Sequence, residues 1–303
     1  MQKLNILLKP LEKEKLEQEL MVSFQEELKE PSFRELVDKL GLSYEVLAKY
    51  TSILKVSALQ YQHCKKCKGL LSCQNEVPGC AYLPKVENQQ VIFCYKACRY
   101  QLAFEEQTAY QKNIALFEVP KELKNASMKQ IFTEDKNRFA AIKWLGTFVK
   151  EYPTTKKGLY LYGSFGSGKT YLVAAAFNEL AKKGVKSAMV FWPEFLRSLK
   201  SSFGNDFSQI YNRVKKAPLL LIDDIGAETS TAWSRDEILC PILQYRMQEH
   251  LPTFFTSNLD LKGLEQHFSM TKDGVEQVKA KRLMERMIQL TEEVSLISKN
   301  LRQ

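Results

Sequence analysis

The sequence lacks any long hydrophobic run. No stretch approaches the roughly 18 apolar residues that a membrane-spanning helix requires, so we expect no membrane partner. The N-terminus has one lysine ahead of a short apolar patch and no small-residue cleavage site, which argues against a secretory signal. Internal repeats and low-complexity tracts are also absent from the sequence. Together these absences predict a globular, cytoplasmic protein.

Acidic residues are too few in the C-terminal part to balance its positive charge. The chain has 303 residues, 45% hydrophobic and 26% charged, and this length predicts one large domain and one small one. The formal net charge of +9 falls almost entirely after residue 118. A basic half favours a polyanionic partner such as DNA, although net charge bears on association and not on chemistry.

Cysteine is nearly confined to one short segment. Six of the seven cysteines lie between Cys64 and Cys98, and in a reducing compartment such clustering favours metal binding over disulfides. Cys64 and Cys67 have the spacing of a structural zinc site and form the first predicted ligand pair. Zn²⁺ takes four ligands, so two further ligands are needed. The candidates are Cys73, Cys80, Cys94 and Cys98, with His63 as a weaker alternative. Such a zinc ion would be a folding cofactor.

Helical periodicity dominates before the cysteines, and helices alternate with strands after them. Residues 11–28 and 32–40 and the stretch after Ser43 have amphipathic helical spacing, typical of a small core or of a docking surface for another protein. The later alternation favours a parallel sheet covered on both faces. We therefore predict an α/β protein in three parts: a small, mostly helical zinc-binding domain (1–115), a linker (116–130) and a larger domain with a parallel sheet flanked by helices (131–303).

A phosphate-binding motif lies between an apolar strand at residues 158–162 and a helix that begins at Lys169. It fits the pattern GxxxxGK[ST]. Glycines let such a loop turn its N–H groups around a phosphate at the positive end of the helix. We expect Lys169 to reach the β- and γ-phosphates of ATP and Thr170 to hold Mg²⁺. The predicted nucleotide-binding residues are Gly163, Ser164, Phe165, Gly166, Ser167, Gly168, Lys169 and Thr170.

Polar residues end two further apolar strands. Asp223 and Asp224 follow the apolar run 219–222, where a P-loop protein needs carboxylates for its metal and for the attacking water. We expect Asp223 to bind Mg²⁺, mostly through water, and Asp224 to orient or activate the hydrolytic water. Asn258 follows the strand at 253–256 and is predicted to hydrogen-bond the γ-phosphate or that water, although Asn is also a common turn residue.

Longer strings around these residues resemble one family. Besides the P-loop they are LLIDDIGAE (220–228), RDEIL (235–239), LQYRMQE (243–249) and LPT (251–253) leading into TSN (256–258), with a cysteine-rich N-terminal part joined through VPK (119–121). Over nearly its whole length the chain resembles the AAA+ ATPases that load the bacterial replicative helicase.

The resemblance implies partners and further site residues. In this family the N-terminal domain grips the hexameric helicase, the ATPase domain contacts single-stranded DNA, and the loader is an oligomer on the helicase that can meet other primosome proteins. By position, Arg286 matches an arginine finger that acts on a neighbouring subunit, and Arg302 matches a late, lid-type arginine that contacts nucleotide. We expect no separate helical lid, because the sequence ends one residue after Arg302. The family's ligand positions favour Cys80 and Cys98 as the second zinc pair.

Aromatic and basic residues are interleaved in the segment 191–200. Phe191 and Phe195 lie close to Arg197 and Lys200, and a basic helix with Arg213, Lys215 and Lys216 follows. This pattern suits stacking and phosphate contact on a single strand. The helical spacing of Phe191, Phe195 and Leu199 equally predicts a core face. The resemblance favours DNA contact by Arg197, Lys200 and the neighbouring helix.

Three other functions share parts of this pattern. A P-loop phosphotransferase would need an arginine-rich lid and an acceptor pocket, neither of which is evident. A zinc adaptor could use nucleotide only as a switch, with little turnover. An ATPase helper of DNA transposition shares the core but would lack the cysteine domain. We therefore predict a weak ATPase, stimulated by oligomerisation, DNA or a partner, that delivers the hexameric helicase onto single-stranded DNA during replication initiation or restart.

Overall fold

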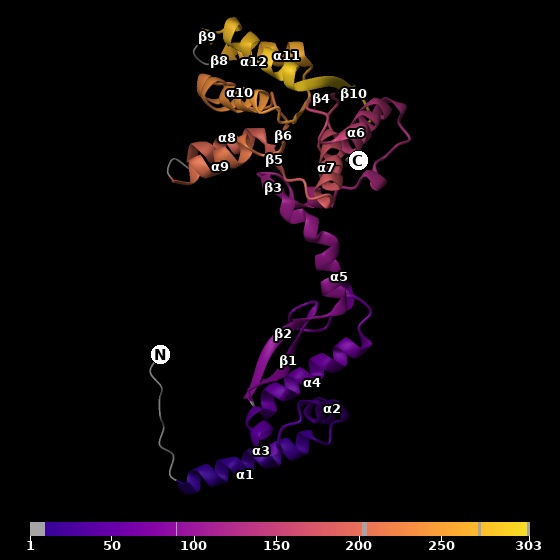
Figure 1. Cartoon of the computed structure of the whole chain (residues 1–303), viewed down its shortest axis with the longest axis vertical. Coiled ribbons are helices and arrows are strands. Elements are labelled where there is room, and N and C mark those ends of the chain that lie inside the picture. Colours follow the sequence, from indigo (N-terminus) through magenta and orange to yellow (C-terminus); the bar gives the residue numbers. More distant parts are fainter. Residues whose placement is uncertain (1–9, 89, 202–204, 272–273, 302–303) are drawn as a thin grey trace. The chain divides into compact units, whose positions relative to one another are not determined.

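A computed structural model of the chain describes residues 10–88, 90–201, 205–271 and 274–301 (Figure 1). The chain forms two compact units, Met1–Thr108 and Ala109–Gln303. Among the described helices, none combines the length and the apolar character needed to cross a bilayer.

The first unit combines helices with one antiparallel hairpin. Its helices are α1 (Pro10–Glu27), α2 (Pro31–Leu40), α3 (Tyr44–Leu47), α4 (Thr51–Lys66) and α5 (Arg99–Thr108), and its strands are β1 (Cys80–Glu87) and β2 (Gln90–Ala97). Phe24, Phe33 and Leu54 from the helices pack with Val91 of the hairpin. The sequence predicts a mostly helical unit and misses the hairpin, because neither strand buries alternate residues regularly.

A six-stranded, all-parallel sheet is the base of the second unit and confirms the predicted α/β fold. The strand order is β10-β4-β7-β6-β5-β3. The strands are β3 (Ile114–Phe117), β4 (Gly158–Gly163), β5 (Ser187–Phe191), β6 (Leu219–Asp223), β7 (Thr253–Ser257) and β10 (Thr291–Leu296). Because parallel strands end at the same edge, the residues after β4, β6 and β7 come together there.

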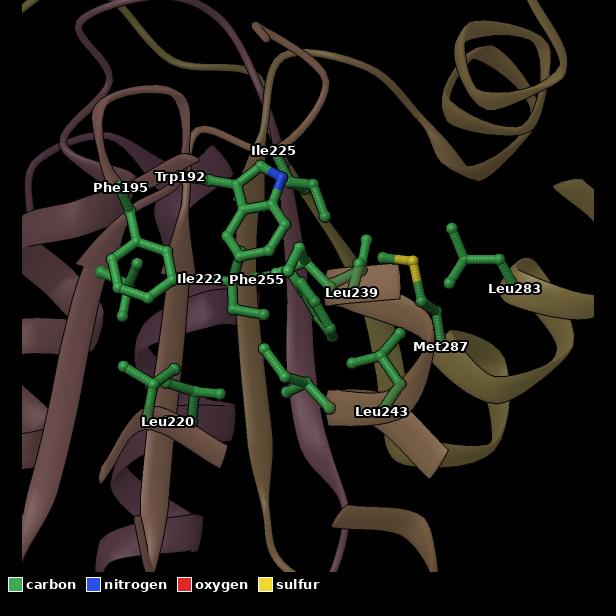
Figure 2. Packing of buried hydrophobic residues seen from close by; sticks show 14 of the residues in the cluster. Trp192, Phe195, Leu220, Ile222, Ile225, Leu239, Leu243, Phe255, Leu283 and Met287 are labelled. Atoms are coloured by element: carbon green, nitrogen blue, oxygen red, sulfur yellow. The ribbon is translucent and has the colours of Figure 1, made fainter. Parts of the chain in front are cut away.

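Helices cover both faces of this sheet (Figure 1). One face carries α6 (Phe139–Glu151) and α7 (Lys169–Lys182); the other carries α8 (Trp192–Ser201), α9 (Asn205–Lys215), α10 (Cys240–Gln248), α11 (Leu261–Ser269) and α12 (Gln277–Leu290). A π-helical turn, Trp233–Leu239, leads into α10, and a short hairpin, β8 (Met270–Thr271) and β9 (Gly274–Val275), separates α11 from α12. Successive side chains point to opposite faces, so Ile222 and Phe255 pack with Leu243 and Met287 on the second face (Figure 2).

The segment predicted as a linker, residues 116–130, packs onto the second unit. Its start belongs to β3, which pairs with β5, and Asn178 of α7 donates hydrogen bonds to the carbonyls of Leu123 (2.9 Å) and Ala126 (2.7 Å). The compact unit begins at Ala109, ahead of the predicted boundary at 115. The polar composition of this segment predicts a linker; in the structure, short 3₁₀ turns and the two hydrogen bonds from the Asn178 amide hold it on the second unit.

Candidate functional site

The loop between β4 and α7 borders a cavity of about 790 Å³. Gly166 and Gly168 have φ values of 70° and 82°, a left-handed conformation that glycine adopts at little cost. Six of the eight predicted P-loop residues line the cavity: Phe165, Gly166, Ser167, Gly168, Lys169 and Thr170. Gly163 and Ser164 do not line it, but their carbonyls accept hydrogen bonds from Lys169 Nζ at 3.0 and 2.9 Å. The loop therefore presents glycine backbone and one ammonium group to the cavity.

A carboxylate and two hydroxyls meet at the end of β6. Thr170 Oγ1 donates to Asp223 Oδ1 at 2.6 Å, and Thr256 Oγ1 donates to the same oxygen. Asp223 is only 8% exposed, and burial raises the pKa of its carboxyl above the ordinary value against the opposing effect of the two hydroxyls. A buried carboxylate beside a hydroxyl is a donor set that suits a hard cation such as Mg²⁺.

Asp224 and Asn258 lie beside this group. Asp224 has φ +56°, and its N–H donates to Thr256 Oγ1 at 2.9 Å. Asn258 Nδ2 donates to Asp224 Oδ1 at 3.2 Å, and Asn258 Oδ1 accepts from Lys169 Nζ at 2.9 Å. Asn258 thus connects the P-loop lysine with the second aspartate. The structure brings together the residues predicted at the ends of three different strands.

Arg138 and the segment after β10 also border the cavity, and the sequence interpretation missed both. Arg138 is 1% exposed; its Nε donates to Phe132 O at 2.9 Å and its Nη1 to Ser167 O. Burial lowers the pKa of this guanidinium. Leu301 lines the cavity and donates its N–H to Gly166 O at 2.9 Å. No motif marks these residues, because only the fold brings them to the P-loop.

The two predicted arginines have different outcomes. Arg286, on α12, is not among the residues that line the cavity of its own chain. Its guanidinium donates to Gln244 Oε1 at 2.8 Å and to Arg282 O at 3.1 Å. Arg302 lies outside the described residues. The role of each arginine stays a prediction.

The aromatic residues proposed for DNA stacking belong mostly to the core. Phe195 and Leu199 are each 1% exposed, so the core alternative is correct for them (Figure 2 shows Phe195). The spacing of these residues in the sequence could not separate a DNA-stacking face from a core face, because both recur with the helical period. Arg197 is exposed and pairs with Glu194 at 2.6 Å, and Lys200 lies over the ring of Trp233 at 4.9 Å. The exposed cations of α8 remain candidates for phosphate contact.

The cysteine cluster surrounds a second cavity, of about 300 Å³, lined by Cys64, Cys67, Cys73, Cys98 and His63. Cys80 is not a lining residue, but its carbonyl accepts from the Asn75 amide at 2.8 Å, and the same amide donates to Cys64 Sγ at 3.3 Å. Burial raises the pKa of the Cys64 thiol. Within the described residues, no group of three or more His, Cys, Asp or Glu side chains is arranged to hold a metal ion. The structure therefore does not show the predicted zinc site. The thiols that line the cavity are nevertheless the donor type that zinc takes, and the site stays a prediction.

Comparisons with known proteins extend beyond the P-loop. A family model described as AFG1-like ATPase matches residues 96–217. The chain is 39% identical over 249 residues to the replicative helicase loader DnaI of Bacillus subtilis (strain 168), covering 80% of this chain and 79% of that protein. A crystal structure of DnaI is similar with a TM-score of 0.56 and 44% identity, over 63% of this chain and 98% of that one.

A putative primosome component from Streptococcus pyogenes serotype M3 is similar to the same extent. Its TM-score is 0.56 and its identity 37%, over 64% of this chain and 98% of that one. The likeness to DnaI in sequence covers most of both proteins, and the likeness in structure is to solved chains of the same kind. The chain belongs to the DnaI family of replicative helicase loaders.

Proposed function

We propose that this protein is an ATP-dependent loader that binds the hexameric replicative helicase in the cytoplasm and delivers it onto single-stranded DNA during replication initiation or restart. The observation that carries the proposal is the pair of linked contacts at one sheet edge, Lys169 with Asn258 and Asp224, and Thr170 with Asp223, in a chain of the DnaI family. A nucleotide site of this kind can time a cycle of binding and release.

The side chains at this edge have separate tasks in ATP hydrolysis. The P-loop N–H groups and Lys169 bind the phosphates, and Asp224 accepts a hydrogen bond from, and takes the proton of, the attacking water. Asn258 holds both Lys169 and Asp224 in position. Thr170 and Asp223 would hold Mg²⁺, which when bound neutralises charge on the β- and γ-phosphates. Arg138 fixes the P-loop through the Ser167 carbonyl.

Arg286 would complete the site of a neighbouring subunit in an oligomer on the helicase. Its bonds to Gln244 and to the Arg282 carbonyl hold the guanidinium on the surface of α10 and α12, away from its own nucleotide cavity. This anchoring supports a role between subunits, because an arginine that acts on a neighbour must be fixed outside its own site. Turnover by an isolated subunit would then be weak.

The first unit would hold a structural zinc ion and bind the helicase. Cys64, Cys67 and Cys98 would supply thiolates, and Cys80 or Cys73 the fourth. We expect about one zinc per chain by atomic emission for the parent and for Cys94→Ser, whose thiol is exposed, and clearly less for Cys64→Ser. Chelator should lower the melting temperature of the parent but not of Cys64→Ser. Equal zinc content in all three proteins would contradict the ligand assignment.

The test of the loader proposal uses the full-length chain with its cognate replicative helicase. Co-purification measures binding, and transfer of helicase onto circular single-stranded DNA, with ATP or a non-hydrolysable analogue, measures delivery. We expect the parent to bind and deliver, and Lys169→Ala to bind but not deliver. Absence of any helicase complex would overturn the proposal. Delivery that is unaffected by Lys169→Ala would instead indicate an adaptor whose ATP site is dispensable.

A further inference from the structure

The amino ends of three neighbouring strands border a further cavity in the ATPase unit. Asn113 precedes β3, Ser187 begins β5 and Pro218 precedes β6, and all three line a space of about 540 Å³. Since the sheet is parallel, this edge lies opposite the one that carries the P-loop. Figure 1 shows α8 and α9 beside β3 and β5 in this part of the unit. The ATP site does not use any of these residues.

The lining of this cavity is strongly basic. It includes Lys112, Lys186, Arg213 and Lys216, and no Asp or Glu. The four side chains are exposed, and within the described parts of the chain none of them forms an ion pair. Lysines elsewhere do pair, as Lys39 does with Glu35. Four like charges around one space repel each other, and an anion between them would relieve that repulsion.

Two buried side chains near the cavity also bear on whether it can bind an anion. Ser187 is 4% exposed, and its Oγ has no hydrogen-bond partner among the described residues. Arg246 is fully buried behind the cavity wall and donates to the carbonyl of the lining residue Ala217 at 2.6 Å. Burial lowers the pKa of Arg246 to about 9, so it still carries its charge at neutral pH. The Ser187 hydroxyl can donate a hydrogen bond to a bound anion. The Arg246 guanidinium already donates to four protein oxygens, so it contributes positive potential behind the wall and no direct contact.

We propose that this basic cavity binds backbone phosphates of single-stranded DNA. The inference rests on the proposed delivery of helicase onto DNA, and it identifies this cavity as the surface that binds the DNA. The cations come from three separate segments and lie on an open rim, which suits successive phosphates of a strand better than one enclosed small ligand. Arg213 also lies over the Phe117 ring at 5.5 Å, and Lys215, next to the lining residue Lys216, lies over the Tyr245 ring at 4.9 Å; neither ring lines the cavity.

The test compares two charge-matched double variants of the full-length protein in single-stranded DNA binding. Lys186→Gln with Lys216→Gln should weaken binding about tenfold or more at low salt and reduce the slope of log K against log salt by about 1.4, because each lost phosphate contact removes about 0.7 on single strands. Lys143→Gln with Lys150→Gln, both exposed on α6, should match the parent. ATP turnover without DNA should be unchanged in both double variants.

A third double variant separates this inference from the proposed function. Arg197→Gln with Lys200→Gln removes the exposed cations of α8. If it weakens DNA binding while the Lys186/Lys216 variant binds like the parent, the cavity is the wrong site and DNA delivery stands. If the parent itself binds no single-stranded DNA, the proposed delivery fails. If the Lys186/Lys216 variant loses affinity only for inorganic pyrophosphate, the cavity is a small-anion site and the inference is overturned.

Discussion

Asp224 is held in a left-handed backbone conformation by Thr256 at its N–H and by Asn258 at its carboxylate. Asn has the same shape and tolerates this conformation. Asp224→Asn therefore removes the base and keeps the loop. We expect ATP turnover to fall by about 10² to 10⁴-fold, the usual contribution of a positioned base, while nucleotide affinity stays close to that of the parent. Steady-state phosphate release and titration with a fluorescent nucleotide measure the two quantities.

The matched control for this variant is Glu237→Gln, an exposed carboxylate on the π-helical turn. It should keep the turnover of the parent. A similar loss of turnover in both variants, or full turnover in Asp224→Asn, would show that Asp224 is not the base.

Arg138 is a buried cation whose hydrogen bonds go to backbone carbonyls. Arg138→Met would leave the carbonyls of Phe132 and Ser167 without these donors, at about 1–3 kcal/mol for each one that stays buried. We expect the free energy of unfolding to fall by about 2–6 kcal/mol and nucleotide binding to weaken, because Ser167 loses its anchor. Denaturant unfolding tests the first effect. Lys136→Met, at an exposed neighbour, should leave both quantities unchanged; an equally stable Arg138→Met would refute the role.

At the scale of elements, Glu35 connects α2 with α4. It accepts from Lys39 at 2.9 Å and from Lys65 of α4, and these hydrogen bonds, that of Lys65 foremost, lower the pKa of its carboxyl to about 2. The folded-state pKa lies below the ordinary 4.5, so the ion pairs contribute stability above pH 4.5 that is lost as the pH falls toward 2.

Glu35→Gln should remove that part of the pH dependence. Because the carboxyl is exposed, solvent screens the pairs and the effect at neutral pH should be small. Denaturant unfolding between pH 2 and 5 measures it. Glu17→Gln, an exposed position on α1, should retain the slope of the parent. An unchanged slope in Glu35→Gln would mean that other carboxylates determine the acid sensitivity.

The segment after β10 holds the P-loop. Leu301 N–H donates to Gly166 O, and Ser298 Oγ donates to Asp135 at 2.6 Å. Deleting all residues after Leu296 should weaken nucleotide binding about tenfold, since two hydrogen bonds contribute about 0.5–1.5 kcal/mol each and 1.4 kcal/mol is a factor of ten. Isothermal titration measures the affinity. Leu301→Ala keeps the backbone bond and should have a smaller effect; parent-like affinity in the deletion would contradict the role of this segment.

The central elements of the sheet could be predicted from the sequence, and the outer ones could not. β4 and β6 are buried on both faces and form continuous apolar runs, and the P-loop glycines locate the helix that follows. β10 lies at the sheet edge and begins Thr-Glu-Glu, so its pattern is polar. The same limit applies to the site: strand ends point to Asp223, Asp224 and Asn258, but Arg138 becomes part of it only through tertiary packing.

At the scale of the whole molecule, the nucleotide site of one chain would be complete only with Arg286 of another. Arg286→Ala should lower turnover by about 10³-fold or more, as arginine fingers do, although this residue does not line its own cavity. Mixing Arg286→Ala with Asp224→Asn should restore part of the turnover, because a mixed pair can form one site with both groups. Phosphate release across mixing ratios measures this recovery.

The control for the mixing experiment is each variant with an excess of itself, which should stay inactive. If the mixture is no more active than its components, Arg286 does not act between subunits. An Arg286→Ala variant with the turnover of the parent would remove the arginine from the reaction altogether.

The left-handed backbone at Asp224 also affects which residue a selection for stability would favour at this position. Aspartate adopts that conformation more readily than most residues, and glycine adopts it with still less strain. A laboratory selection for heat resistance alone should therefore favour glycine at this position and yield sturdier proteins that cannot hydrolyse ATP. Persistence of the aspartate in a heat selection carried out in living cells would instead indicate that the cells depend on ATP turnover by this chain.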